Sequence, residues 1–538
     1  MKKITLFVFL FSNFVVFSQE DAWVYFNSKP DAQTYFDNPL LMLTQRALDR
    51  RMVQNILIDI KDVPIYQPYI DQIESASGIT VKAKSKWFNA VHVQGPQSDI
   101  EALKILSIVD HLDFVDRKLN VAGKFAIPKQ ISKVNKTLEK TITYNYGTSA
   151  NQIRMLNGDL LHQQNFTGSG IVIAVMDGGF PGVDTATTFS KLQDNSQILG
   201  GYDFVNRSAN FYSGIDHGTM VLSTMGGFLD SQLVGTAPDA SYYLFITEDY
   251  NNEVPLELSL WVEAAEEADR VGADIITTSL GYTQFDNPNY NYTYNDMDGN
   301  TTFISKGLDI AFSRGMICVV SAGNEGNKSW QYISAPADAN QALSVGAVDS
   351  NGIYAAFSSQ GPSFDGRVKP DVVAQGQQSV LSDMNGNVTT ASGTSFSGPI
   401  IAGLVASLWQ ALPNKTNEEI VELIKGSSSL YSTPNTELGY GIPDFNLALN
   451  SALTIQKFSN KQYVVYSNPE NNNLVSVSST KRLEKSKIIL YSILGQKVLE
   501  KEISEQNQTI DCTNLNFGLY LYQIISDNYS QSGKIFKK

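Results

Sequence analysis

Three side chains of this 538-residue sequence have the types that acyl transfer needs: a serine nucleophile, a histidine base and an aspartate. Ser395 precedes the small and apolar run 396–406, which predicts a helix whose first backbone N–H groups stabilise negative charge. Asp177 is the first polar residue after the apolar run 171–176. His217 is the only histidine that follows Asp177, so a Ser/His/Asp site in this region must use it.

A fourth side chain, the amide of Asn324, follows the apolar run 317–321 beside two glycines and can donate a hydrogen bond to an oxyanion. Each of the four also has an ordinary structural interpretation. Ser395 alone is more simply a helix N-cap, and Asp177 a turn residue before glycines. His217 and Asn324 would then be a structural histidine and a turn asparagine. Their occurrence together favours the catalytic interpretation.

The segments that would position these residues alternate between apolar runs and helix-like stretches. A continuous apolar run is typical of a parallel strand buried on both faces, and functional groups gather where such strands end. We therefore expect an α/β domain over 146–453, with a parallel sheet between two layers of helices. Its predicted strands are 171–176, 242–246, 275–281, 317–321 and 343–348, and its predicted helices include 258–271 and 301–314.

Segments of a different character flank this domain. Residues 1–18 are typical of a secretory signal peptide, with two lysines, an apolar core and a cleavage site before Gln19. Residues 118–145 are basic and poor in aromatics, and this composition fits a solvated connector and a protease-sensitive linker equally well. Residues 460–538 contain short strands with Asn-rich turns, which predict a small β-sandwich.

The segment 19–117 predicts a small α+β domain. Its strand-like stretches are 23–26 and 87–93, and its helix-like stretches are 41–54 and 70–76.

Composition excludes several other classes of protein. A net charge of −14 argues against a nucleic-acid partner, because a phosphate binder needs concentrated Lys and Arg. None of the four histidines forms the His-Glu-x-x-His motif, so a zinc hydrolase of that kind is unsupported, and the sequence offers no metal-binding residues. Cys318 lies in an apolar run and is expected to be a buried core residue, and nothing favours a disulfide with Cys512. No segment after the signal peptide is long and apolar enough to be an integral membrane span.

Four short motifs together resemble those of the subtilisin-like serine proteases, in that family's order. They are Asp177-Gly178-Gly179, His217-Gly218-Thr219, Ser321-Ala322-Gly323-Asn324 and Gly393-Thr394-Ser395. The resemblance covers roughly residues 145–450. The sequence departs from the family at Gly178, where Ser or Thr is usual, and at Phe396-Ser397, where Met-Ala is usual. Neither departure removes a reacting group, so they bear on substrate preference more than on activity.

The resemblance implies a serine endopeptidase with polypeptide substrates. Ser395 would attack the scissile carbonyl, His217 would transfer the proton, Asp177 would orient the imidazole, and Asn324 would donate to the oxyanion. By the same resemblance, Ser279-Leu280-Gly281 would pair with the substrate backbone as an added strand. The walls of the pocket for the side chain before the cut would be Ala322, Gly323, Ala335, Pro336 and Ala337.

The flanking domains have resemblances of their own. Residues 19–117 resemble the inhibitory, fold-assisting propeptides of this family, and this resemblance implies that the chain is a zymogen. The tail resembles the C-terminal sorting domain of proteins exported by the type IX secretion system, through Asn468-Pro469, Leu494-Gly495, Gly518-Leu519-Tyr520 and the terminal Lys-Ile-Phe-Lys. We therefore expect export through the periplasm, followed by release or attachment to the cell surface. The resemblance makes calcium plausible, but the sequence offers no identifiable ligand set, so we expect no cofactor and leave calcium as the alternative.

Three other functions fit the sequence less well. An α/β-hydrolase needs Gly-x-Ser-x-Gly, but position 397 is Ser, and in that class the serine precedes the histidine. An acid peptidase with Glu in place of His is countered by His217. The remaining alternative is a catalytically inactive surface protein that uses the subtilase fold for binding, and the four intact residues argue against it.

Overall fold

The computed structural model describes residues 19–120, 144–459, 463–467, 473–479, 486–492, 496–504, 507–526 and 529–537. The expected signal peptide (1–18) and most of the basic linker (121–143) lie outside the described residues, as do Asn468-Pro469, Leu494-Gly495 and Lys538. The chain divides into two compact units, with the boundary between Leu449 and Asn450. Each unit contains one buried, free cysteine, Cys318 in the first and Cys512 in the second.

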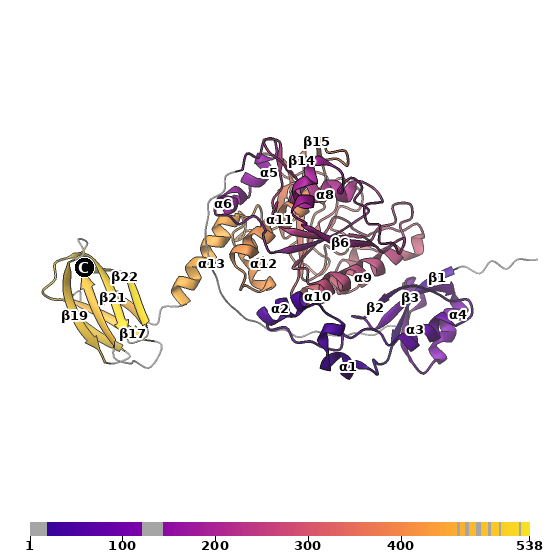
Figure 1. Cartoon of the computed structure of the whole chain (residues 1–538), viewed down its shortest axis with the longest axis horizontal. Helices are drawn as coiled ribbons and strands as arrows, with labels where there is room; N and C mark the ends of the chain where they lie inside the picture. Colours follow the sequence, from indigo (N-terminus) through magenta and orange to yellow (C-terminus); the bar gives the residue numbers. More distant parts are fainter. Residues whose placement is uncertain are drawn as a thin grey trace, which may run out of the picture. The chain divides into compact units, whose positions relative to one another are not determined.

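The first unit is built on a seven-stranded parallel sheet in the order β13-β12-β11-β10-β5-β9-β6. The strands are β5 (Val172–Asp177), β6 (Ile198–Asp203), β9 (Ser241–Ile246), β10 (Ile275–Thr278), β11 (Ile317–Ser321), β12 (Ala342–Val348) and β13 (Val372–Gln375). Helices α9 (Leu256–Val271) and α10 (Phe303–Ser313) pack on one face, and α8 (His217–Gly226) and α11 (Thr394–Ala411) on the other (Figure 1). The predicted three-layer α/β architecture is confirmed.

Helix α11 lies inside the domain along nearly its whole length. Every residue from Thr394 to Trp409 is buried, which suits its sequence of small and apolar residues. Because an apolar helix surrounded by protein has no solvent-facing side, its ends can be positioned by contacts from several strands at once.

Shorter elements complete this domain. They are α5 (Ala150–Arg154), α6 (Gly158–Gln163), α7 (Ser190–Asp194), α12 (Asn417–Gly426), and the hairpins β7 (Phe228–Leu229) with β8 (Leu233–Val234) and β14 (Ser379–Ser382) with β15 (Val388–Ala391). Helix α13 (Phe445–Ser459) begins in the first unit and ends in the second.

The N-terminal domain is an antiparallel sheet in the order β2-β3-β1-β4, with two helices on one face. Its elements are β1 (Gln19–Phe26), α1 (Ala32–Asp37), α2 (Gln45–Val53), α3 (Gln67–Glu74), β2 (Thr80–Ser85), β3 (Ala90–Pro96), α4 (Gln97–Ala102) and β4 (Val109–Phe114). The other face packs on α9 and α10, where the Trp23 ring stacks on Phe303 at 4.5 Å between centroids.

The α+β expectation for this domain is confirmed, with corrections to its elements. The predicted strand 87–93 begins only at Ala90, because Asn89 adopts a positive φ of 51° in a turn. The predicted helix 41–54 begins at Gln45, because the Thr44 side chain accepts a hydrogen bond from Ala47 N and caps the helix there. Strands β2 and β4 were not predicted.

The second unit contains two antiparallel sheets, β16-β17-β20 and β19-β18-β21-β22. The strands are β16 (Tyr463–Ser467), β17 (Leu474–Ser479), β18 (Ser486–Tyr491), β19 (Lys497–Ile503), β20 (Asn507–Asp511), β21 (Gly518–Ser526) and β22 (Tyr529–Lys537). Val477 and Ile510 of the smaller sheet share a buried core with Ile488 and Ile524 of the larger one, as in a β-sandwich. In the described part of the chain, no helix combines the length and the apolarity that crossing a membrane requires.

Candidate active site

The strand order brings the predicted site residues to one edge of the sheet. After β5 the chain builds β6 and β9 on one side, and then returns to place β10 on the other side of β5. Such a reversal of strand order leaves a crevice at the carboxyl ends of the strands. Asp177 ends β5, Ser279 directly follows β10, and Asn324 comes shortly after β11.

Asp177 and His217 form a hydrogen-bonded pair. His217 is the first residue of α8, and its Nδ1 donates to Asp177 Oδ1 at 2.8 Å. The same oxygen accepts from Gly178 N at 2.8 Å, and the aspartate is only 1% exposed. The charge of Asp177 raises the pKa of His217 above its ordinary value, against the lowering effect of burial. Because Nδ1 carries the proton, Nε2 is left as the basic nitrogen.

Ser395 is the second residue of α11, in the helix's first turn. Pro399 lies four residues further on and has no N–H, so it cannot donate the usual helical hydrogen bond to the Ser395 carbonyl. The Ser279 hydroxyl donates to that carbonyl instead, at 3.0 Å. The end of β10 therefore helps to fix the backbone of the candidate nucleophile.

Asn324 is held against the same helix by its carbonyl oxygen. Asn324 Oδ1 accepts from Thr394 N at 2.9 Å and from Thr394 Oγ1 at 3.1 Å. The Ser321 hydroxyl in turn donates to the Thr394 carbonyl at 2.8 Å. With the oxygen engaged in this way, the Asn324 Nδ2 donors are the end of the amide that remains for a ligand.

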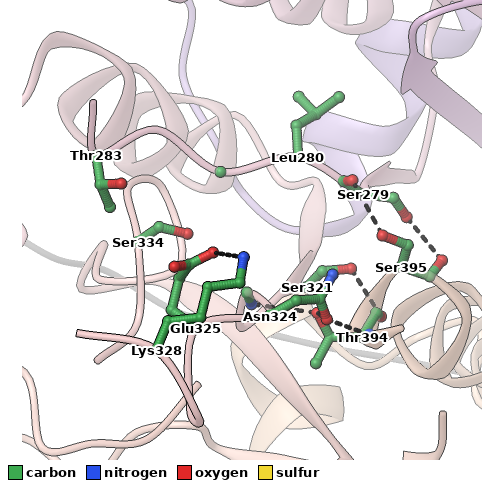
Figure 2. A pocket seen from close by; sticks show the side chains of 12 residues that line it. Ser279, Leu280, Thr283, Ser321, Asn324, Glu325, Lys328, Ser334, Thr394 and Ser395 are labelled. Carbon is green, nitrogen blue, oxygen red and sulfur yellow. Dashed lines mark hydrogen bonds and ion pairs between the residues drawn. The ribbon is translucent and has the colours of Figure 1, made fainter. Parts of the chain in front are cut away.

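A cavity of about 200 Å³ lies beside these residues (Figure 2). Of the predicted residues, Ser279, Leu280, Gly281, Gly323, Asn324 and Ser395 line it. Thr283, Ser321, Glu325, Lys328, Ser334 and Thr394 line it too and were not predicted as site residues. Glu325 and Lys328 form an ion pair of 2.8 Å at this cavity. Glu325 directly follows Asn324, and this position is what could have identified it as a lining residue from the sequence.

The other predicted wall residues lie outside this lining. Ala322, Ala335 and Ala337 are completely buried, and the Ala335 carbonyl accepts from Tyr282 N at 2.8 Å. This hydrogen bond holds the backbone at Tyr282, which lies between the two lining residues Gly281 and Thr283. The roles of Ala322, Ala335, Pro336 and Ala337 in substrate binding stay predictions.

The predicted nucleophile and base, Ser395 and His217, are not hydrogen-bonded to each other in this structure. The Ser395 hydroxyl donates to the Ser279 carbonyl at 3.4 Å, at the long limit for a hydrogen bond, and not to His217. His217 lies beside Phe396, the residue after Ser395, with 5.9 Å between ring centroids. The arrangement of Asp177, His217 and Ser395 as a working triad therefore stays a prediction.

The departure at Gly178 has a steric reason. A Cβ atom at this position would lie 2.9 Å from Cγ1 of Ile215, the residue two before His217. Carbon atoms do not approach this closely without displacement, so the missing side chain makes room for Ile215.

Among the described residues, no group of three or more His, Cys, Asp or Glu side chains is arranged to hold a metal ion. The described residues therefore offer no such set of donors for the calcium ion that the resemblance suggests.

Comparison with known families gives three matches along the chain. Residues 168–441 match the subtilase family, 21–135 match the propeptide domain of S8 peptidases from Bacteroidota, and 464–538 match a secretion system C-terminal sorting domain. The propeptide and sorting resemblances are confirmed, and with the latter the expected secretion or attachment at the cell surface. The expected domain boundaries stay predictions.

Individual relatives share less than 30% of their residues with this chain over the aligned regions. Serine protease AprX of Bacillus subtilis (strain 168) is 28% identical over 310 residues, which cover 52% of this chain and 65% of AprX. The matched region thus spans slightly less than two thirds of that relative. Subtilisin E of the same organism is 29% identical over 296 residues, which cover 54% of this chain and 69% of its own. The crystal structure of MycP1 with its N-terminal propeptide removed superposes with a TM-score of 0.45 at 22% identity, covering 56% of this chain and 96% of that one.

Proposed function

Because the chain belongs to the subtilase family, we propose that it is a secreted serine endopeptidase acting through Asp177, His217, Ser395 and Asn324. The observation that carries the proposal is the hydrogen bond from His217 to the buried Asp177, at the end of the sheet where Ser395 lies in the first turn of a buried helix. A family assignment gives the fold and the reaction class, whereas the site must supply the chemistry.

Acyl transfer would begin with proton transfer from Ser395 to His217. The Asp177 carboxylate holds Nδ1–H, so Nε2 takes the serine proton and later returns it to the leaving amine. Ser395 first has to leave the Ser279 carbonyl. That 3.4 Å hydrogen bond is long and weak, and catalytic hydrogen bonds often tighten only when substrate is bound.

The oxyanion of the tetrahedral intermediate would be met by two donors. One is the Ser395 backbone N–H, which lies in the first helical turn and has no acceptor within the helix. The other is Asn324 Nδ2, whose direction is set by the two hydrogen bonds to Thr394. Preorganised donors of this kind lower the barrier because they need no reorientation during the reaction.

Polypeptide substrate would lie along Ser279-Leu280-Gly281, where β10 has ended and the chain no longer pairs within the sheet. The N-terminal domain would inhibit the enzyme until the linker between Arg117 and Tyr146 is cut. We infer this from its match to propeptides and from its packing on α9 and α10.

Labelling with a fluorophosphonate tests the proposal, because only an activated serine reacts with it. The mature wild-type enzyme should be labelled and should cleave peptides, and Ser395→Ala should do neither while keeping its circular dichroism spectrum. Ser392→Ala, an exposed serine three residues away, is the matched control and should still be labelled. Normal turnover by Ser395→Ala would refute the mechanism. An unlabelled, inactive wild type that binds polypeptides would favour the inactive binding protein.

A further inference from the structure

The last described turn of the propeptide contains an arginine that contacts a loop of the enzyme domain. Arg117 opens a 3₁₀ turn (Arg117–Leu119) and its guanidinium forms a bidentate pair with Asp296. One of the two hydrogen bonds joins Nη2 to Oδ2 at 2.7 Å, and the other joins Nη1 to Oδ1. The same guanidinium lies over the Tyr292 ring, 5.6 Å from its centroid. A planar fork with an aromatic ring beneath it is a geometry that suits arginine and not lysine.

The receiving carboxylate is held by the enzyme's own loop. Asp296 Oδ2 accepts from Thr293 N at 2.7 Å and from Thr293 Oγ1 at 2.9 Å, which fixes the side chain. The Asp296 side chain is only 9% exposed, whereas that of Arg117 is 43% exposed. Burial raises the pKa of Asp296, but hydrogen bonds from Arg117 and Thr293 outweigh it and hold the pKa below its ordinary value. The site belongs to the enzyme, and the arginine reaches into it from outside.

This site is connected to the substrate cavity by one hydrogen bond. Tyr292 N donates to the Thr283 carbonyl at 2.9 Å, and Thr283 lines the cavity. Figure 2 shows Thr283 at the end of the cavity away from Ser395. The chain from Ser279 to Thr283 therefore leads from the candidate nucleophile towards the arginine site.

We propose that Tyr292 and Asp296 form a subsite for an arginine on the N-terminal side of the scissile bond, which the propeptide fills with Arg117 in the precursor. The proposal rests on the proposed endopeptidase function. When the propeptide leaves, Asp296 Oδ1 loses its guanidinium partner, while Thr293 still donates its two hydrogen bonds to Oδ2 and holds the carboxylate in place. A carboxylate fixed by its own loop, with one oxygen open to a guanidinium, forms charge-assisted hydrogen bonds, so a substrate arginine is favoured there over a neutral side chain.

The test compares matched peptides on the mature enzyme. For each position before the cut, two peptides are prepared that differ at that position alone. One carries arginine there and the other carries glutamine. The measured quantity is the ratio of kcat/KM with arginine to kcat/KM with glutamine, which cancels any change in rate that both peptides share. At one position the wild-type ratio should be about tenfold, as a charge-assisted bidentate pair with an aromatic contact supports.

Asp296→Asn keeps an oxygen for the two Thr293 hydrogen bonds but removes the charge, and should bring this ratio close to unity. Asp286→Asn removes the same charge from an exposed residue of the same loop and should leave the ratio as in the wild type. A wild-type ratio near unity at every position would overturn the subsite, as would an undiminished ratio in Asp296→Asn. Failure to cleave any peptide, arginine or glutamine, would instead overturn the proposed function on which the subsite rests.

Discussion

At the scale of single residues, Asn324 performs two tasks with the two ends of one amide. Its oxygen joins the end of β11 to the start of α11 through Thr394, and its nitrogen is left for the oxyanion. The first task is structural and the second is catalytic, so the two can be separated by substitution.

We expect Asn324→Ala to lower kcat by about 10²–10³-fold with little change in KM, the size known for this donor in a subtilisin. Because the Thr394 N–H then loses its acceptor, Tm should fall as well. Asn324→Asp is the matched variant: it keeps the acceptor oxygen, so Tm should change less, while kcat falls at least as far. Steady-state kinetics and thermal unfolding measure both, and a change confined to KM would place Asn324 in ground-state binding.

The candidate residues themselves were predictable, but their supports were not. Asp177, His217, Asn324 and Ser395 stand in short local motifs at element ends, where sequence is informative. The contact from Ser321 to Thr394 joins positions 73 apart, and no local pattern reveals it. The pocket residue Ser334 was missed for the same reason, because its place follows from the fold around it.

At the scale of elements, the position of α11 depends on a glycine. A Cβ at Gly403 would lie 2.9 Å from Cβ of Thr236 and 3.1 Å from its backbone carbon. Thr236 is completely buried, and its carbonyl accepts from Ser407 Oγ at 3.1 Å, so it has little freedom to move. The helix that carries Ser395 is therefore seated by close approach to a fixed segment.

Gly403→Ala should cost about 1–3 kcal/mol of stability, as overpacking of a filled core does, and should lower kcat by shifting α11. Gly426→Ala is the control, since a Cβ at that position of α12 meets nothing within 4 Å. Alanine is the better helix former, so this variant should be equally or slightly more stable. Chemical denaturation gives both free energies, and equal stabilities for the two variants would contradict this account.

Most elements with a strong apolar pattern were predicted, although the short buried strand β13 was not, and weakly patterned elements were missed. The runs that became β5, β9, β11 and β12 are largely buried, as expected of central parallel strands. Strand β6 was missed because it lies at the sheet edge, is mostly half-buried and contains two glycines. The predicted strand 275–281 ends at Thr278, since Ser279 and the residues after it leave the sheet to line the cavity.

At the scale of the whole molecule, the propeptide is joined to the enzyme by buried charges. Arg51 donates to Asp62 of its own domain and, at 2.6 Å, to Asp269 of α9. Burial raises the pKa of Asp269, but the charges of Arg51 and Arg50 hold it down at about 2. Removal of one member of such a network leaves a buried charge without its partner, so substitution of Arg51 is expected to weaken the contact between propeptide and enzyme.

The tail, by contrast, should be dispensable for catalysis. The buried residues Phe445, Ala448, Leu449 and Ala452 of α13 remain in a chain that ends at Gln456. We expect this truncated protein, matured in vitro, to keep its kcat/KM on a peptide substrate but to stay in the periplasm of its native host. Peptide assays and cell fractionation measure the two properties. Full export with lost activity would reverse the assignment.

Each compact unit also contains one buried cysteine whose alkylation rate reports when that unit opens. Burial raises the pKa of both thiols, so Cys318 and Cys512 are protonated and enclosed at neutral pH. Such a thiol reacts with an alkylating reagent only when its surroundings open. The rates at which the two sites are modified therefore record, within one intact chain, how often the enzyme and the sorting domain each lose their structure.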